Sequence, residues 1–306
     1  MAVSEIDFKV NNLVTRAISG GIFVGVVIVS VLLKNSVFFG AVFMLMCVLG
    51  MREFYKLCRL KPNVEPAYVL AIAGGLAAYL CAYFCCVVIN RPVEWLDWLH
   101  NLSGAGNPFT ILAFYLPFVV AQLVVELYRQ KAEPIVNIAV ALMGHLYVAV
   151  PFCCMCAIEG MGQVYLLSFF VMIWASDTGA YLVGMCIGKH KMFERISPKK
   201  TWEGFCGGLA FALVFGGLFS KFSYVFPDVN VELKTWQWFA FAVVVFITGT
   251  LGDLVESLFK RHLGIKDSGK FLPGHGGVLD RLDSALLAAP VALSFLSIVL
   301  YLNGKA

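Results

Sequence analysis

Long apolar stretches separated by short charged segments run through most of the chain. An α-helix needs about 20 mostly apolar residues to cross a bilayer core of roughly 30 Å. The stretches therefore predict an all-α integral membrane protein of about nine transmembrane helices. The predicted spans are residues 17–33, 35–51, 67–89, 109–127, 135–158, 163–188, 204–226, 236–258 and 283–302. The first two spans meet at Lys34 and are expected to form a helical hairpin.

The loops between these spans differ in their content of basic residues. With nine spans, 18 of the 23 Lys and Arg lie on the same side of the membrane as the N-terminus, and 5 lie on the other side. Cytoplasmic loops carry the excess of Lys and Arg in membrane proteins. The imbalance therefore places the N-terminus and the two most charged loops in the cytoplasm.

Composition agrees with a membrane protein and argues against several other classes. Apolar residues make up 60% of the chain and charged residues 14%, against about 25% charged in soluble domains. A net charge of +4 is too small to indicate a nucleic-acid partner. Most of the ten cysteines lie in apolar runs without paired CxxC motifs or His partners, which favours packing over zinc or redox sites. Glycine pairs such as Gly184/Gly188 and Gly204/Gly208 predict close contact between helices.

The densest group of charges follows the eighth predicted span, between Asp253 and Asp283. Five cationic side chains in it are suited to binding a polyphosphate: Lys260, Arg261, Lys266, Lys270 and Arg281. Three glycines lack the side chains that would keep an anion from backbone N–H groups: Gly274, Gly276 and Gly277. A basic loop that touches anionic lipid headgroups is the simpler alternative. It explains the Lys and Arg but not the interleaved acids and glycines.

Acidic residues lie at both ends of this segment. Asp253 has Glu256 on the same helical face, and Asp280 and Asp283 are three residues apart where the last span begins. Magnesium usually takes one or two carboxylates together with phosphate oxygens. The acids and cations together therefore predict a Mg²⁺–nucleotide site. Residues Gly264–Lys270 resemble a P-loop, but Phe271 replaces the required Ser or Thr and no strand precedes the loop.

Two further features are expected to belong to the same site. Ser197 and Pro198 predict the start of a helix, because the hydroxyl caps free amides and proline suits the first turn. Lys199 and Lys200 would then make this helix end a phosphate cradle. Asp177 interrupts the sixth span, where a helix–helix ion pair or a hydrated helix end is the alternative interpretation.

With these residues in view, the chain resembles the phosphatidate cytidylyltransferase family, also called CDP-diacylglycerol synthases. Ser257, Phe259, Lys260 and Arg261, then Lys266, Asp267 and Gly269, then His275, Gly276, Gly277, Asp280, Arg281, Leu282 and Asp283 all match the family signature. The Ser197–Gly204 segment and a pattern from Trp174 to Gly184 match as well. The resemblance covers roughly the C-terminal half. We therefore expect residues 1–160 to serve lipid access and packing, and residues 161–306, with cytoplasmic loops 189–203 and 259–282, to form the catalytic region.

The resemblance implies an enzyme of phospholipid biosynthesis that converts CTP and phosphatidic acid into CDP-diacylglycerol and pyrophosphate. It also implies Mg²⁺ held by Asp253 and Asp280, with Asp283 as a further candidate, and a second, monovalent cation such as K⁺. Expected catalytic residues are Asp253, Asp280, Lys260, Arg261 and Lys266. Expected substrate-binding residues are Ser197, Lys199, Lys200, Asp177, Ser257, Asp267, Lys270, His275, Gly276, Gly277 and Arg281. Family members also form homodimers, and the location would be the plasma or inner membrane in a bacterium.

Two other functions are compatible with part of this pattern. A CTP-dependent lipid-alcohol kinase of related architecture would release CDP instead of pyrophosphate. A transporter also carries acids within its spans. A transporter, however, needs those acids at the membrane midplane, whereas Asp253 and Asp280 are predicted near the cytoplasmic surface.

Overall fold

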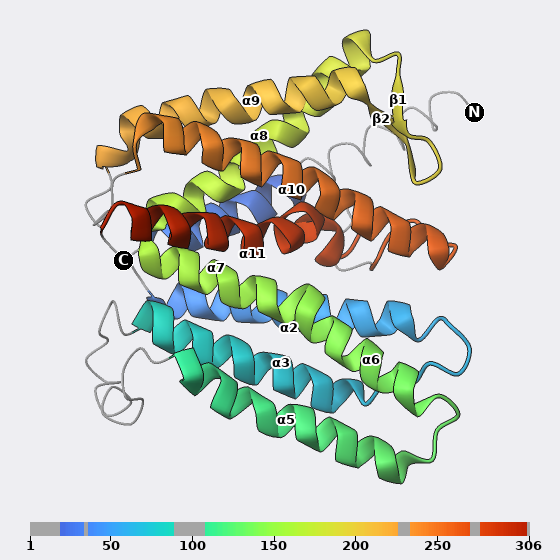
Figure 1. The fold of residues 1–306 in the computed structure, drawn as a ribbon. Coiled ribbons are helices and arrows are strands. Elements are labelled where there is room, and N and C mark those ends of the chain that lie inside the picture. The colour runs from blue at the N-terminus through green and yellow to red at the C-terminus, as the bar shows by residue number, and fades with distance from the viewer. Residues whose placement is uncertain (1–18, 34–35, 89–107, 226–232, 270–275, 305–306) are drawn as a thin grey trace.

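The computed structural model describes residues 19–33, 36–88, 108–225, 233–269 and 276–304. In these ranges the chain is almost entirely helical (Figure 1). A short apolar helix, Ser19–Leu32, precedes the labelled ones. The helices are α2 (Ser36–Cys58), α3 (Tyr68–Tyr83), η1 (Phe84–Val88), α5 (Pro108–Arg129), α6 (Pro134–Gly144), η3 (His145–Ala149), α7 (Val150–Met161), α8 (Gln163–Ile187), α9 (Trp202–Phe222), η4 (Ser223–Val225), α10 (Thr235–His262) and α11 (Leu279–Leu302).

Eight candidate spans in the described residues are long and apolar enough to cross a membrane. They are Ser36–Cys58, Tyr68–Val87, Leu112–Arg129, Pro134–Met161, Gln163–Ile187, Trp202–Phe222, Thr235–His262 and Leu279–Leu302. Each matches a predicted span within a few residues, except that α2 and α10 end, and α11 begins, one to two turns outside it, in charged residues. A helix can continue into water where its apolar run ends, so hydropathy alone misplaces these three ends.

The remaining predicted span, 17–33, corresponds to the shorter helix Ser19–Leu32. Its first residues, and Lys34 in the predicted hairpin turn, lie outside the described part of the chain. The structure therefore gives an all-α membrane protein with eight spans of full length, and the predicted count of nine is not confirmed.

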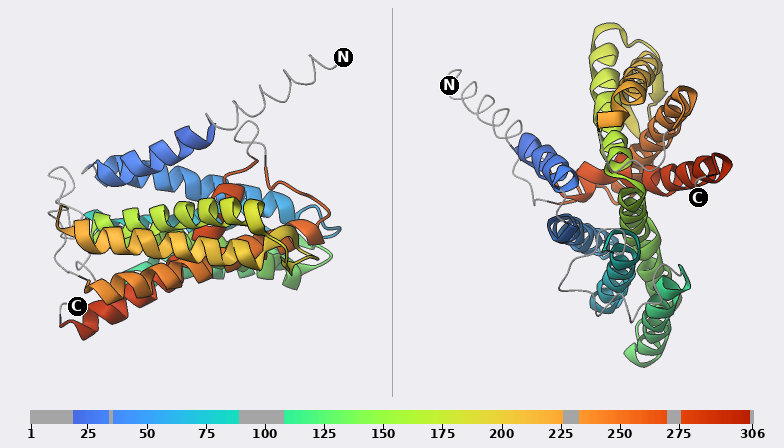
Figure 2. Two further views of the ribbon diagram at one scale, coloured as in Figure 1. Left: turned by 90° about the horizontal axis from the view of Figure 1, so that it is seen from above. Right: turned by 90° about the vertical axis from the view of Figure 1, so that its left-hand side faces the viewer.

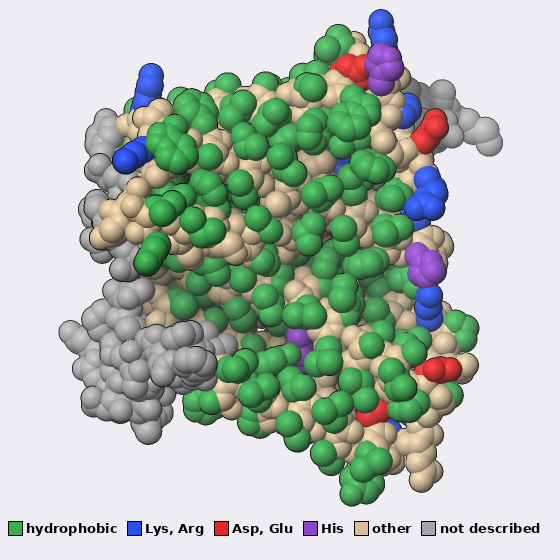
Figure 3. All heavy atoms as spheres, in the orientation of Figure 1, with side chains coloured by type: hydrophobic (Ala, Val, Ile, Leu, Met, Phe, Trp, Pro, Cys, Tyr) green, Lys and Arg blue, Asp and Glu red, His purple; other side chains and the backbone are tan. Residues whose placement is uncertain are grey.

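The helices form two groups that share a central pair. Helices α8, α9 and α10 pack together, as do α2, α3 and α5, while α7 and α11 contact each other between them. The right-hand view of Figure 2, along the helices, shows this division. Phe43, Phe152, Phe170 and Phe241 lie in the continuous buried core and are almost inaccessible to solvent. The outer faces carry many exposed apolar side chains (Figure 3), as lipid-facing helices require.

Glycines bring α8 and α9 close together. A Cβ atom added to Gly184 would lie 3.6 Å from the Cα atom of Gly204, and one added to Gly208 would lie 2.9 Å from the carbonyl oxygen of Ser176. The predicted packing role of these small residues is therefore confirmed for the α8–α9 contact.

A short hairpin connects α8 to α9 and corrects the predicted helix start. Strands β1 (Lys191–Phe193) and β2 (Ser197–Thr201) pair antiparallel. Ser197 and Pro198 thus lie in a strand, and the prediction that they begin a helix is wrong. Helix α9 begins at Trp202, where the Thr201 hydroxyl accepts a hydrogen bond of 3.2 Å from the N–H of Gly204. Both Ser and Thr cap helices, so the motif alone did not identify which hydroxyl does so.

Most charged side chains of the described residues gather where α2, α5, α8 and α10 end and α3, α6, α9 and α11 begin. We call this the charged end; it lies at the right in Figures 1 and 3. The hairpin of β1 and β2 is also there (Figure 1). The topology of the helices therefore collects the separate charged segments of the sequence at one end of the molecule.

Candidate active site

Helices α10 and α11 lie side by side and carry the acids of the predicted site (Figure 1). Gly252 allows this contact, because a Cβ atom there would lie 2.5 Å from the carbonyl oxygen of Asp283. The neighbouring Asp253 is therefore close to Asp283 across the interface. Asp253, Glu256 and Lys260 follow one face of α10 at intervals of three and four residues. We call Asp253, Glu256, Lys260, Asp280 and Asp283 the charged row.

The carboxylate of Asp280 is held by four donors. Its Oδ1 atom lies 2.7 Å from the ammonium nitrogen of Lys260. Its Oδ2 atom accepts hydrogen bonds of 2.8 Å from the N–H and hydroxyl of Ser268 and from the N–H of Gly277. Gly276 precedes with a φ angle of +81°, a left-handed conformation that favours glycine. Gly276 and Gly277, two of the glycines predicted to let backbone approach an anion, thus approach a carboxylate of the protein itself.

Asp253 joins the charged row to the second predicted segment. Its Oδ2 atom lies 2.8 Å from the ammonium nitrogen of Lys200, and its Oδ1 atom accepts a hydrogen bond of 3.2 Å from the Ser257 hydroxyl. Lys200 also donates a hydrogen bond of 3.4 Å to the carbonyl oxygen of Thr250. Residues about fifty positions apart in sequence therefore meet at one carboxylate.

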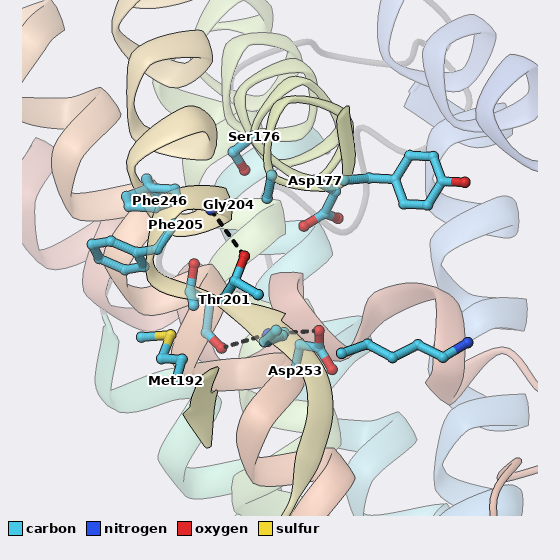
Figure 4. Close-up of a pocket in the computed structure, with 13 residues that line it drawn as sticks. Ser176, Asp177, Met192, Thr201, Gly204, Phe205, Phe246 and Asp253 are labelled. Carbon is cyan, nitrogen blue, oxygen red and sulfur yellow. Dashed lines mark hydrogen bonds and ion pairs between the residues drawn. The ribbon is translucent and has the colours of Figure 1, made fainter. Parts of the chain in front are cut away.

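A cavity of about 280 Å³ opens beside this ion pair. Asp177 from α8 and Asp253 from α10 lie on different walls of it, and Thr201 and Gly204 lie between them (Figure 4). Its cationic side chains are Lys199 and Lys200, and the rest of its lining is largely apolar, including Phe205, Phe246, Met192 and Tyr181. We call it the Lys200 cavity. A ligand with a phosphate group and an apolar body would match this lining.

Glu256 is the unusual member of the charged row. Its side chain is 1% exposed, and the ammonium nitrogen of Lys260 lies 3.4 Å from Oε2. No other hydrogen-bond donor among the described residues contacts its carboxyl oxygens, and its carboxyl group lies against that of Asp283. Burying two neighbouring acids is costly. The row therefore gathers four carboxyl groups beside two lysines, Lys200 and Lys260, within the described residues.

The remaining predicted residues are placed differently from one another. Arg261 donates hydrogen bonds of 3.4 Å to the carbonyl oxygens of Ile196 and Ile265, so it links α10 to the β1–β2 turn. Lys266 and Asp267 are exposed. Arg281 is half-buried in the first turn of α11. Lys270, Gly274 and His275 lie outside the described residues.

Glu53 also belongs to this region, although no sequence pattern pointed to it. Glu53 near the end of α2 accepts a hydrogen bond of 2.9 Å from the N–H of Leu279, the first residue of α11, and one of 3.4 Å from the Ser268 hydroxyl. A Cβ atom on Gly269 or Gly277 would overlap the Glu53 carboxylate. Glu53 thus caps α11 and contacts two of the residues around Asp280. Its only signal in the sequence is a lone acid in the basic segment 52–61.

No group of three or more His, Cys, Asp or Glu side chains in the described ranges forms a metal-binding cluster. Asp253 and Asp280 each contact a lysine and hydrogen-bond donors, whereas Glu256 contacts Lys260 alone among the cations of the described residues. Any metal at this site would be bound by one or two carboxylates and completed by other ligands.

The cytidylyltransferase family matches residues 14–299. A phosphatidate cytidylyltransferase of Staphylococcus saprophyticus is 32% identical over 269 residues, 87% of this chain and 92% of the relative. One from Staphylococcus haemolyticus is 36% identical over 208 residues, 67% of this chain and 74% of the relative. One from Staphylococcus aureus is 43% identical over 153 residues, 50% of this chain and 56% of the relative. These matches extend the resemblance beyond the charged segments to nearly the whole chain, which belongs to the phosphatidate cytidylyltransferase family.

Proposed function

We propose that this protein transfers the cytidylyl group of CTP to phosphatidic acid at the charged end of the membrane bundle. A phosphate oxygen of phosphatidic acid forms a bond to the α-phosphorus of CTP. The bond from that phosphorus to the bridging oxygen breaks, its electron pair goes to pyrophosphate, and CDP-diacylglycerol is the lipid product. The observation that carries the proposal is the Lys200–Asp253 ion pair of 2.8 Å, which unites both family segments at a cavity.

Electrostatics and positioning account for most of the proposed catalysis. Both substrates are anions, so the main barrier is to bring them together. A phosphate monoester is largely ionised near neutral pH, because its second pKa is about 6, and the attacking oxygen needs no general base. Lys199 and Lys200 are proposed to hold the phosphate of phosphatidic acid, and the apolar wall of the Lys200 cavity its glycerol and the first part of its acyl chains.

The charged row is proposed to bind the nucleotide with magnesium. The fit rests on the four carboxyl groups of the row, which within the described residues contact only two lysines, Lys200 and Lys260. Asp253 and Asp280 would hold Mg²⁺, with Asp283 beside them, and a monovalent cation such as K⁺ is proposed nearby. Magnesium bound there would supply positive charge to the phosphate oxygens and to the leaving pyrophosphate. Lys260 neutralises Asp280, and its flexible side chain is also able to turn toward a phosphate bound at the row.

Other parts of the proposal concern the surroundings of the site. The distribution of Lys and Arg favours a cytoplasmic position of the charged end. The helices before residue 160 are proposed to serve lipid access and packing. The family resemblance supports a homodimer, which chemical cross-linking in native membranes would test.

The decisive experiment identifies the products. Purified full-length protein is incubated with Mg²⁺, phosphatidic acid and CTP labelled at the α-phosphorus, and the lipid and soluble products are separated. Label in a CDP-lipid together with release of pyrophosphate supports the proposal. Release of CDP with label only in the soluble fraction would indicate a kinase instead. If the folded, unsubstituted protein forms no CDP-lipid while a known cytidylyltransferase forms it in the same assay, the proposed reaction is disproved.

A further inference from the structure

A second cationic cavity borders Ser268, whose N–H and hydroxyl contact Asp280 of the charged row. It has a volume of about 440 Å³ and is lined by the end of α2, the start of α3 and residues Ser268 and Gly269. Its cationic side chains are Arg52, Lys56 and Arg59, which lie on one face of α2 at intervals of four and three residues. We call it the α2 cavity.

The cations of the α2 cavity have no acidic partner among the described residues. In the described part of the chain, Arg52 and Lys56 are exposed and neither forms an ion pair with an acid. The guanidinium carbon of Arg59 lies 5.2 Å from the centre of the ring of Tyr68, which also lines the cavity. Three positive charges therefore face one space of molecular size.

The one acid in the lining is committed elsewhere. Glu53 directs its carboxylate to the N–H of Leu279 at 2.9 Å and to the hydroxyl of Ser268. The Ser268 hydroxyl in turn lies 2.8 Å from the Asp280 carboxylate. Ser268 thus both lines the α2 cavity and contacts Asp280, a predicted catalytic aspartate.

The two cationic cavities are arranged alike around the charged row. The Lys200 cavity ends at Asp253, and the α2 cavity is separated from Asp280 by the single residue Ser268. A reaction that joins two phosphate-bearing molecules needs two places for phosphate. The lining of the α2 cavity is more polar and more cationic than that of the Lys200 cavity, with Tyr68 as its exposed aromatic ring.

We propose that the α2 cavity is a phosphate-binding site formed by Arg52, Lys56 and Arg59. This inference deepens the proposed function and rests on it for the identity of the ligand. The phosphate belongs either to the nucleotide, as its β- and γ-phosphates or the released pyrophosphate, or to a lipid headgroup at the membrane surface. Guanidinium and ammonium groups bind both through charge-assisted hydrogen bonds.

The test removes two charges and keeps the size of the side chains. The variant is Arg52→Gln with Lys56→Gln, and the matched control is Lys61→Gln with Lys131→Gln, which removes two charges from the same end outside this cavity. Full-length proteins are purified and reconstituted in phosphatidylcholine vesicles. KM is measured for CTP and, separately, for phosphatidic acid. Because the substituted residues are exposed, we expect all proteins to unfold at similar temperatures without ligand.

Two lost charge-assisted hydrogen bonds are expected to raise one KM value at least about tenfold, while the control stays within about twofold of wild type. A rise for CTP alone identifies nucleotide phosphate as the ligand, and a rise for phosphatidic acid alone identifies lipid phosphate. Both results support the cavity as a phosphate site. Unchanged KM values for both substrates, equal to those of the control, would overturn the proposal.

A second measurement does not depend on turnover. The unfolding temperature of each protein in neutral detergent is recorded against increasing sodium pyrophosphate and, separately, dihexanoyl phosphatidate. We expect the half-saturating concentration of one probe to rise at least about tenfold in the Arg52/Lys56 variant only. If these probes raise the unfolding temperature of the wild type, but the wild type forms no CDP-lipid, the proposed reaction fails while the phosphate site stands. If the variant and control respond equally to both probes, the phosphate site fails.

Discussion

Two buried polar regions of this protein have opposite characters. In the N-terminal helices, His145 lies 2.7 Å through Nε2 from the carbonyl oxygen of Ala71 and 2.8 Å through Nδ1 from the Tyr115 hydroxyl. A carbonyl only accepts, so Nε2 carries the proton and Nδ1 accepts from the tyrosine. The uncharged ring has both nitrogens paired.

The same region also pairs its charges. Glu126 accepts hydrogen bonds of 2.7 Å from Asn137 at one oxygen and from Arg129 at the other. Asn137 accepts in turn from the N–H of Glu65 at 2.7 Å. These groups, from α5, α6 and the loop before α3, balance one another.

The charged row between α10 and α11 is not balanced. Asp253, Glu256, Asp280 and Asp283 outnumber the cations that contact them, and the Glu256 oxygens lack hydrogen bonds in the described residues. Both regions are costly to bury in a membrane protein. The comparison teaches that a matched network stabilises the fold, whereas unmatched charge beside a cavity indicates a place for a ligand.

The largest test of this distinction removes charge from the row. Asp253→Asn and Asp280→Asn are each expected to lower CDP-diacylglycerol formation at least about a thousandfold, as loss of a group that stabilises transition-state charge does. Product formation and the unfolding temperature are both measured. Glu133→Gln, an exposed acid at the same end, serves as the control. Near-normal turnover of either Asn variant in folded protein would remove that aspartate from the proposed metal site.

A second test addresses Glu53, which connects α2 to the first residue of α11. Glu53→Gln weakens the hydrogen bonds from Leu279 and Ser268. Ser268 also holds Asp280, so this carboxylate would be positioned less firmly. Loss of such supporting hydrogen bonds typically costs 10- to 100-fold in activity, and we expect about that decrease. Gly277→Ala, which forces a side chain against the same carboxylate, should act in the same direction.

The readout must separate positioning from folding. KM, kcat and the magnesium concentration for half-maximal activity are measured together with thermal unfolding. A positioning role predicts a changed magnesium dependence in Glu53→Gln with partial recovery in Glu53→Asp. If activity instead falls only in proportion to the amount of folded protein, Glu53 merely stabilises α11.

The opposite result is expected in the balanced network. His145→Phe leaves the Ala71 carbonyl and the Tyr115 hydroxyl without their partner, at a cost of about 1–3 kcal/mol for each unsatisfied buried group. We expect a lower unfolding temperature and unchanged KM and kcat in the remaining folded protein. Loss of turnover without loss of stability would place His145 in the chemistry and break the comparison.

Sequence patterns predicted the spans well because the physical requirement is simple. Long apolar runs such as residues 163–188, in which Asp177 is the single charged residue, have one stable form in a bilayer, and α8 begins and ends within one residue of that prediction. Local capping was less predictable. Ser197 and Thr201 are both competent caps, and only the pairing of β1 with β2 excludes the first.

The site was partly predictable for a similar reason. Asp253, Lys260 and Asp280 stand out as charges next to apolar runs, and the structure brings them together with Lys200. The phosphate cradle at Lys199 and Lys200 stays a prediction, because the helix start on which it was based lies at Trp202 instead. Contacts between distant segments did not stand out. Glu53 is 226 residues from Leu279, and the contact depends on how α2 packs against α11. No local pattern encodes that contact, because it arises from tertiary packing.

The smallest effect is expected at an ion pair that has nearly the same length as the one at the site. Lys131 lies 2.7 Å from Glu65, close to the 2.8 Å between Lys200 and Asp253, but it is exposed and away from the charged row. The hydrogen bond from Lys131 and its charge lower the pKa of Glu65 below its ordinary value of 4.5. What the pair contributes is therefore present above pH 4.5 and is lost as the pH falls through the lowered pKa. Exposed pairs contribute little, so Lys131→Gln should shift the unfolding midpoint by less than about 2 °C at pH 7 and leave KM unchanged. Lys200→Gln, in contrast, should lower turnover, because Asp253 loses its cationic partner beside the cavity and is left next to other acids. If the two substitutions changed turnover and the unfolding midpoint equally, the ion pair at the unbalanced row would have no special role.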